Sequence, residues 1–476
     1  MNSWITLITF AVFVVTFLWV GALAAKSSSN TETDYLLGNR SFGRFFIGLS
    51  TGATVNSGWI MVGAVGMAYK VGISALLMVI PILLGELTFW TLFPDKVNRI
   101  SVERNSQTIP EFLGSSVKKP QGKRAIAFVV AIITIVFVGA YTVAQFSAAA
   151  KILDIFFGVD RNMGILIAAG SILVYCVTGG LRASIWTDVV QAFVVMIVCF
   201  GMLPVAVITG GGISEIFSQL NAIDPQLTNL TAGFTNWTLL AYMVGFFVFG
   251  FGVNVSNPQG LVRLLAGRSP EEAKQAGWIY LAYEYSTWIS MVLFGVVCRV
   301  VIPNLEDPEQ ALPSYAIQNF NPWLIGIVLA GVFSTIASTA DSQILVCSSA
   351  LARDVSPTWY RKMSQKYGVK YEQAMTLVFG IVTTAAAMLI SATVFSLVFF
   401  SAGALGGSLG PAMLIVLLKK RTYTLALSST MLVGLSTTII WRILGYNQIL
   451  NEMLPGFVLA LLVHEGLMRL DGKFKK

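Results

Sequence analysis

Long apolar runs recur along the whole chain, and they leave it few ways to fold. Each run is about 20 residues long, the length of an α-helix that crosses the hydrocarbon core of a bilayer. The runs are continuous, whereas a membrane β-barrel would show short segments of alternating polarity. The sequence therefore predicts about 13 transmembrane helices, centred on residues 4–24, 45–68, 74–93, 125–150, 163–179, 183–209, 238–260, 276–302, 323–350, 372–391, 395–418, 423–441 and 455–468.

The scarcity of charge supports this interpretation. Only 11% of the 476 residues are charged, whereas a soluble domain usually carries about 25%. No metal cluster, nucleophile elbow or phosphate loop stands out, so we expect neither an enzyme nor an organic cofactor. The net charge of +8 is better explained by membrane topology than by binding to nucleic acid.

The basic residues predict the orientation. With the N-terminus outside, all but five of the 31 Lys and Arg residues fall in connections on the inner side, as the positive-inside rule requires. The exceptions are Lys70, Lys151, Arg161, Arg299 and Arg442. We therefore expect an outside N-terminus, an inside C-terminus and a location in the plasma membrane, the inner membrane of a bacterium.

Two spans contain clustered helix breakers. Gly48–Trp59 lies in the second span and Phe249–Gly260 in the seventh, and each segment combines Gly with Asn and Ser. A single kink would be ordinary in a membrane helix, but these two open successive sets of five spans. Breaks at matching positions of two halves indicate a transporter built from inverted repeats, with its site near the bilayer midplane.

The ninth span adds a polar face. Hydroxyl residues at i, i+3, i+4 and i+7 lie on one stripe of a helix, and here they are Thr335, Ser338, Thr339 and Ser342. Such a stripe often serves only helix packing. Asp341 at its edge and Asp188 in the sixth span favour a functional role, because intramembrane carboxylates are costly. Glu86 and Glu284 also lie in apolar runs, and the sequence suggests no partner for either.

Together these segments resemble the sodium:solute symporter family, most closely its sodium/proline symporter branch. The motifs that carry the resemblance are Tyr35–Ser41, Ser50–Trp59, Gly179–Ala192, Ser338–Ser349 and Gly410–Pro411. The resemblance implies an all-α integral membrane protein with a LeuT-like core of two inverted five-helix repeats. The implied parts are an extra N-terminal helix and loop at 1–41, a first repeat at 42–210, an extracellular loop and second repeat at 211–421, and two C-terminal helices and a cytoplasmic tail at 422–476.

The resemblance also implies site residues. A sodium site would use backbone carbonyls and hydroxyls of Ala53, Asn56, Thr335, Ser338 and Thr339. A second cation site, found in some members, would use Asp188, Ser338, Asp341 and Ser342. The solute contacts would be Ser57, Gly58, Tyr141, Asn254 and Pro258.

The chain departs from the proline branch at several of these positions. Val55 stands where that branch has an aspartate, and Asn56 where it has a methionine. Gly250 and Asn254 replace an aromatic pair, and Asp341 replaces a serine. We therefore expect a solute pocket that is less aromatic and more polar than a proline site.

The resulting hypothesis is a secondary active symporter that imports a small polar organic solute. We expect an amino acid such as proline, or a related carboxylate, with Na⁺ as the coupling ion and the lipid bilayer as the environment. Two alternatives remain: a proton-coupled symporter of the same fold, and a membrane sensor that retains the transporter fold.

Overall fold

The chain folds into a bundle of helices. The computed structural model describes residues 3–29, 31–231, 233–390, 394–448 and 450–474. Helices account for 87% of it, and the described residues contain no strand beyond one isolated bridge between Phe42 and Gly267. The predicted all-helical architecture is confirmed.

The helices follow one another with short connections. The first half contains α1 (Ser3–Lys26), α2 (Glu32–Leu37), η1 (Gly38–Arg40), α3 (Arg44–Gly58), η2 (Trp59–Ala64), α4 (Val65–Val71), η3 (Gly72–Ala75), α5 (Leu76–Leu92), α6 (Pro94–Glu103), α7 (Ile109–Gly114), α8 (Pro120–Phe157), α9 (Arg161–Thr209), α10 (Ile213–Ile223) and η4 (Pro225–Thr228). The second half contains α11 (Asn236–Ser256), α12 (Pro258–Leu265), α13 (Pro270–Val301), η5 (Pro308–Gln310), α14 (Ala311–Asn319), α15 (Pro322–Ser349), η6 (Ala350–Asp354), α16 (Pro357–Tyr367), α17 (Val369–Leu389), α18 (Val394–Leu417), α19 (Thr424–Ile443), η7 (Tyr446–Gln448) and α20 (Met453–Phe474).

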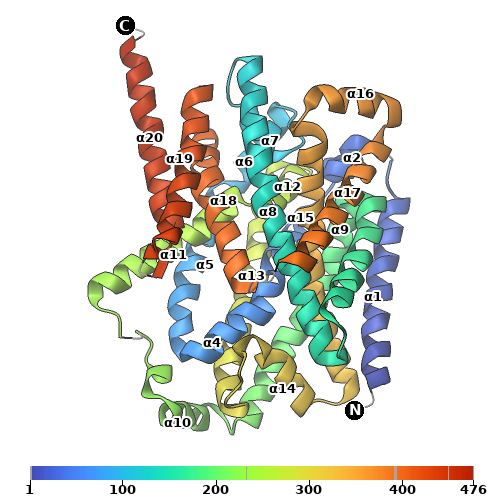
Figure 1. Cartoon of the computed structure of the whole chain (residues 1–476), viewed down its shortest axis with the longest axis vertical. Coiled ribbons are helices and arrows are strands. Elements are labelled where there is room, and N and C mark those ends of the chain that lie inside the picture. The colour runs from blue at the N-terminus through green and yellow to red at the C-terminus, as the bar shows by residue number, and fades with distance from the viewer. Residues whose placement is uncertain (1–2, 30, 232, 391–393, 449, 475–476) are drawn as a thin grey trace.

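The predicted spans lie on these helices. Within the described residues, 11 helical units are long and apolar enough to cross a membrane. Two of these units, Arg44–Leu92 and Arg161–Thr209, are 49 residues long, and each covers two predicted spans. In the second unit the chain turns at Gly180, whose φ of 55° and ψ of −145° lie outside the helical region. The start of α1 and the end of α20 lie at opposite ends of the bundle (Figure 1), and the predicted number of 13 spans stays a prediction.

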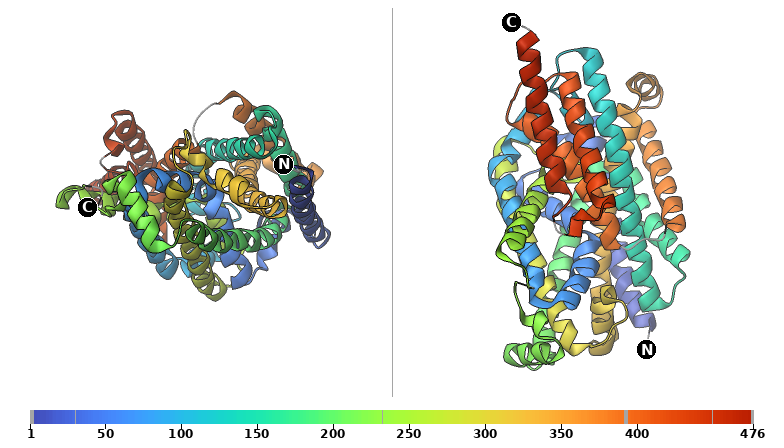
Figure 2. Two further views of the ribbon diagram at one scale, coloured as in Figure 1. Left: turned by 90° about the horizontal axis from the view of Figure 1, so that it is seen from below. Right: turned by 60° about the vertical axis from the view of Figure 1, so that its left-hand side comes forward.

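The helix α15 forms the centre of the bundle. It packs against α1, α3, α8 and α9, and in the span Pro322–Asp354 that contains it 83% of the most apolar stretch is buried. For α1 and α20, at the periphery, the corresponding value is 28%. The long helices run along the long axis of the molecule (Figure 2). The helix with the predicted hydroxyl stripe is therefore surrounded by protein and not by lipid.

Two glycines bring α5 and α11 into close contact. A Cβ atom on Gly250 would lie 2.1 Å from the Ile82 carbonyl oxygen, and one on Gly85 would lie 2.2 Å from the Phe247 carbonyl oxygen. Small residues allow the backbones of membrane helices to approach in this way. The replacement of an aromatic residue by Gly250, noted from the sequence, thus has a structural explanation: no larger side chain fits there.

Substitution of Gly250 by alanine adds a methyl group at the contact between α5 and α11, and it tests whether a larger side chain fits there. We expect Gly250→Ala to lower the free energy of unfolding by about 1–3 kcal/mol, the usual cost of overpacking, because two backbones must separate. Thermal melting in detergent measures the change. Gly201→Ala on α9 is the control, because a Cβ atom there would meet nothing within 4 Å. Equal melting temperatures for the two variants would contradict the explanation.

Candidate functional site

The first predicted break is present. In α3, Ser57 has φ 44° and ψ 171°, a positive-φ conformation that is uncommon for a residue other than glycine. Two nearby backbone donors find other partners. The Gly58 N–H donates to Gln145 Oε1 on α8 (2.9 Å), and the Trp59 N–H donates to Ser57 Oγ (3.1 Å). Protein groups thus satisfy the break, as they must where water is absent.

The second predicted break is present as well. Asn257 separates α11 from α12, with φ −76° and ψ 104°, and Pro258 begins α12. Proline suits the first position of a helix because its missing N–H is not needed there. The Asn257 N–H still donates to the Val253 carbonyl (2.8 Å), so the interruption is short. Both breaks lie inside the segments that the sequence indicated.

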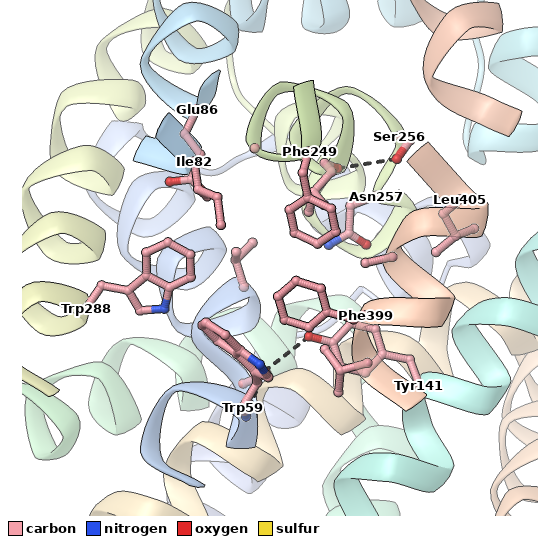
Figure 3. A pocket seen from close by; sticks show the side chains of 16 residues that line it. Trp59, Ile82, Glu86, Tyr141, Phe249, Ser256, Asn257, Trp288, Phe399 and Leu405 are labelled. Atoms are coloured by element: carbon pink, nitrogen blue, oxygen red, sulfur yellow. Dashed lines mark hydrogen bonds between the residues drawn. The ribbon is translucent and has the colours of Figure 1, made fainter. Parts of the chain in front are cut away.

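A cavity lies between the two breaks (Figure 3). It holds about 650 Å³ of space not filled by atoms, part of it open to solvent. Ser57 lines it from the first break, and Ser256 and Asn257 line it from the second. Among the described residues, Asn257 Oδ1 has no hydrogen-bond partner. The cavity therefore offers a solute both hydroxyl groups and a free acceptor.

Aromatic rings form much of its wall, which we did not anticipate from the sequence. The Phe249 and Phe399 rings stack with centroids 4.9 Å apart and an interplanar angle of 12°. Trp59 lies between Trp288 (5.1 Å) and Phe399 (5.5 Å). These rings come from five separate elements when Tyr141 on α8 is included. The expectation considered two positions of α11, whereas α13 and α18 also supply rings, and the comparison with a proline site stays a prediction.

The predicted solute contacts fall into two groups. Ser57 and Tyr141 line the cavity, and the Tyr141 hydroxyl donates to Ser57 Oγ (3.1 Å). Gly58, Asn254 and Pro258 do not line it. Gly58 packs against α8, and Pro258 is buried at the start of α12. Asn254 lies behind the wall of the cavity and donates a hydrogen bond to Glu86 of α5. Direct contact with a solute stays a prediction for all five.

The predicted sodium ligands meet at the contact between α3 and α15, which we call the hydroxyl seam. Ser338 Oγ donates to the Ala53 carbonyl (2.9 Å). Thr339 Oγ1 donates to the carbonyls of Thr54 (2.8 Å) and Thr335 (3.0 Å). Four of the five predicted groups are thus within one hydrogen-bonded cluster. The fifth, the Asn56 carbonyl, accepts from the Trp59 N–H at the adjoining break.

The second predicted cation site contains a positive charge that the sequence did not reveal. Arg263 on α12 is completely buried, and its Nη2 lies 2.8 Å from Asp188 Oδ2. Its guanidinium also donates to Ser50 Oγ (2.9 Å), Ser184 Oγ (3.0 Å) and Ser342 Oγ. From the sequence we had counted this arginine among the basic residues of an inner connection. One side chain thus joins α12 to α3, α9 and α15.

Asp341 completes the same cluster. Its carboxylate accepts hydrogen bonds from the hydroxyls of Tyr175 (3.1 Å), Ser184 (3.0 Å) and Ser342 (2.7 Å). Like Asp188, it is fully buried. The predicted residues of the second site are therefore together, but two carboxylates share one guanidinium, and Asp188 Oδ1 has no hydrogen-bond partner among the described residues.

Removal of the guanidinium should expose this imbalance. We expect Arg263→Leu to lower the free energy of unfolding by about 3–5 kcal/mol, the cost of leaving a buried charge without its partner. Denaturant titration of the purified protein measures the loss.

The double variant Arg263→Leu, Asp188→Leu is the control. It removes both charges of the ion pair, so we expect it to be more stable than the single variant although it has lost one more native side chain. Additive losses in the two single variants and the double variant would show that the pair is not coupled.

Comparison with known proteins agrees with this geometry. The chain is 29% identical to the high-affinity proline transporter PutP of Bacillus subtilis, over 94% of each chain. It is also 29% identical to the sodium/proline symporter of Escherichia coli, covering 95% of this chain and 90% of that protein. A Na⁺-coupled sialic acid symporter, solved in a substrate-bound outward-open state, superimposes with a TM-score of 0.82 at 18% identity, over 97% of this chain and 96% of the other.

These likenesses confirm the fold class and the family. The LeuT-like fold follows from the structural match, and the relatives are membrane transporters rather than enzymes. The profile of the sodium:solute symporter family matches residues 35–434, most of the chain. The protein is a multi-pass membrane transporter, and it belongs to the sodium:solute symporter family.

Proposed function

We propose that this protein imports a small amino acid, with proline as the first solute to test, by symport with Na⁺ that binds at the hydroxyl seam. The observation that carries the proposal is the position of the seam. Its hydroxyls contact the carbonyls of Ala53 and Thr54, and three residues later the same helix breaks at Ser57 and lines the cavity. The names of the curated relatives support proline as the first candidate.

The seam has suitable chemistry for a small alkali cation. Carbonyl and hydroxyl oxygens are hard, neutral ligands of the kind that such cations prefer. In the structure, the hydroxyls of Ser338 and Thr339 donate hydrogen bonds to the carbonyls of Ala53 and Thr54. A hydroxyl can rotate to direct a lone pair at a cation, and each carbonyl oxygen then becomes a ligand too. Neutral ligands bind a cation reversibly, which a transport cycle requires.

Coupling follows because ion and solute share one helix. A cation that bridges α3 and α15 fixes the segment before Ser57, and a solute in the cavity contacts the break itself. Each ligand therefore favours the same arrangement of α3, and each raises the affinity of the other by the same factor. Closure of the Phe249 and Phe399 rings over the cavity would then separate the bound solute from the solution on one side of the membrane.

The driving force is sufficient for accumulation. One Na⁺ that moves inward gains about 2.3 kcal/mol per 100 mV of membrane potential. A tenfold concentration gradient adds about 1.4 kcal/mol. Their sum corresponds to a solute accumulation of several hundredfold.

The buried ion pair argues against the proton-coupled alternative at Asp188. Its carboxylate faces Arg263 at 2.8 Å, and a guanidinium does not lose its proton in a protein. Protonation of Asp188 would remove the one carboxylate in direct contact with that charge and leave only Asp341, in the same cluster, to balance it. Sodium coupling at the neutral hydroxyl seam requires no such step.

Substitution in the seam tests sodium coupling. In proteoliposomes with an inward Na⁺ gradient, we expect Ser338→Ala to reduce the initial rate of labelled proline uptake at least tenfold, because one predicted ligand is lost. Uptake that is equal in Na⁺ and K⁺, with Ser338→Ala fully active, would contradict the proposal. Uptake driven only by a pH gradient would select proton coupling.

A matched substitution on the same helix serves as control. Ser334 lies one turn before Ser338 and is equally buried, but its hydroxyl donates only within α15, to the Ala330 carbonyl (2.6 Å). We expect Ser334→Ala to retain sodium-driven uptake.

A further inference from the structure

Glu86 on α5 is an acid in the wall of the solute cavity (Figure 3). Only 3% of the residue is exposed. One carboxylate oxygen, Oε1, accepts a hydrogen bond from Asn254 Nδ2 (3.2 Å). The other, Oε2, is buried and accepts no hydrogen bond of normal geometry in the described part of the chain, although the Tyr280 hydroxyl interacts with the carboxylate. Buried polar groups normally have a hydrogen-bond partner. A ligand bound in the cavity could supply the partner of this carboxylate oxygen.

The surrounding side chains hold this carboxylate in place. Trp90 Nε1 donates to Asn254 Oδ1 (2.8 Å), so the amide must direct its nitrogen to the other side. That nitrogen donates to the Gly250 carbonyl (3.0 Å) and to Glu86. Trp90 itself stacks on Tyr280 with centroids 4.3 Å apart. Asn254, which does not line the cavity, thus positions a residue that does.

A second acid increases the negative charge of this region. Glu284 on α13 is completely buried, and neither of its carboxylate oxygens has a hydrogen-bond partner among the described residues. It interacts electrostatically with Glu86. Two neighbouring carboxylates in an apolar interior cannot both be charged unless a cation compensates them.

The aromatic wall is suited to such a cation. The face of an aromatic ring is negative and attracts a cationic nitrogen, by about 2 kcal/mol or more when water is excluded. Trp288, Phe249 and Phe399 line the same cavity as Glu86. A carboxylate together with several ring faces is a combination that binds substituted ammonium groups, whereas a neutral sugar or a simple anion would leave the charge of Glu86 unpaired.

We propose that Glu86 is the counter-ion for a positively charged nitrogen of the transported solute, and that the aromatic rings surround the carbon substituents of that nitrogen. The solute is then an amino acid, an imino acid or a betaine, and not a neutral polyol or a monocarboxylic acid. This inference rests on the proposed transport function and narrows its solute class. Asn254 is a positioning residue for the carboxylate.

Isosteric pairs of compounds test the need for a positive nitrogen. L-proline is compared with cyclopentanecarboxylate, and glycine betaine with 3,3-dimethylbutanoate. Within each pair a charged nitrogen is replaced by carbon at nearly constant shape. Binding to the full-length protein in lipid nanodiscs, at a fixed and saturating Na⁺ concentration, is measured by calorimetry. We expect the nitrogen member of at least one pair to bind tenfold or more tightly than its carbon analogue.

Glu86→Gln identifies the counter-ion. The glutamine keeps an oxygen that can accept from Asn254 and removes only the charge, so we expect the preference for the nitrogen member to fall at least tenfold. Glu215→Gln, on helix α10, removes a charge that does not line the cavity. This variant should keep the preference for the nitrogen member of each pair. A stabilising shift of the melting temperature by Na⁺ that persists in Glu86→Gln shows that the fold and the hydroxyl seam are intact.

The outcomes separate this inference from the proposed function. Equal binding of both members of every pair, no binding of any nitrogen compound, or an unchanged preference in Glu86→Gln would each overturn the role of Glu86. A Glu86→Gln effect on pH dependence alone would point to a proton shared by Glu86 and Glu284 and would overturn it as well. Loss of sodium dependence in the wild-type protein would instead contradict the proposed function.

Discussion

In hydrocarbon, an unpaired backbone N–H or C=O group costs several kcal/mol, so a membrane helix can stop only where protein receives the loose groups. The structure contains two such places, at Ser57 and Asn257, on either side of one cavity. Gln145 and the Ser57 hydroxyl satisfy donors at the first break. The cavity, the hydroxyl seam and the close contact of α5 with α11 are all arranged around these two interruptions.

Buried charge organises the same region at two levels. In the first cluster, Arg263 connects the short helix after the second break to Asp188, and through serine hydroxyls to α3 and α15. In the second cluster, Glu86 has no cationic partner among the described residues. The first cluster is balanced internally apart from one carboxylate, and its ion pair stabilises the arrangement of four helices. The second cluster is balanced only when a cation enters the cavity. This difference supports a structural role for the first cluster and the proposed role in solute recognition for the second.

Much of this architecture could be predicted from the sequence, because it depends on patterns along one helix. The apolar runs gave the spans, the Gly/Asn/Ser clusters gave both breaks, and helical spacing placed Ser338 and Thr339 on one face. The partner of Asp188 could not be predicted in this way. Arg263 follows a break and precedes a basic connection, so its position along the chain resembles that of a topological signal, and only packing shows that it points inward.

The lining of the solute cavity could not be predicted from local sequence patterns either. From the loss of aromatic residues at Gly250 and Asn254, the sequence predicted a pocket less aromatic and more polar than a proline site. It did not reveal that Trp288 and Phe399 reach the cavity from distant segments. Gly250 instead allows α5 to approach, and this approach brings Glu86 to the cavity wall. The glycine at position 250 leaves α11 without an aromatic ring there, and it also makes room for Glu86 of α5 at the cavity wall. Only the three-dimensional packing of the two helices shows this second effect.

The central claim is that Na⁺ binds at the seam between α3 and α15. The most direct test is the thermal stability of the purified protein, without any solute, as Na⁺ replaces K⁺ at constant ionic strength. A ligand that binds only the folded state stabilises it by about 2.7 kcal/mol at 100 times its Kd. We expect the melting temperature to rise with Na⁺ along a saturating curve. Identical melting temperatures in Na⁺ and K⁺ at every concentration would contradict it.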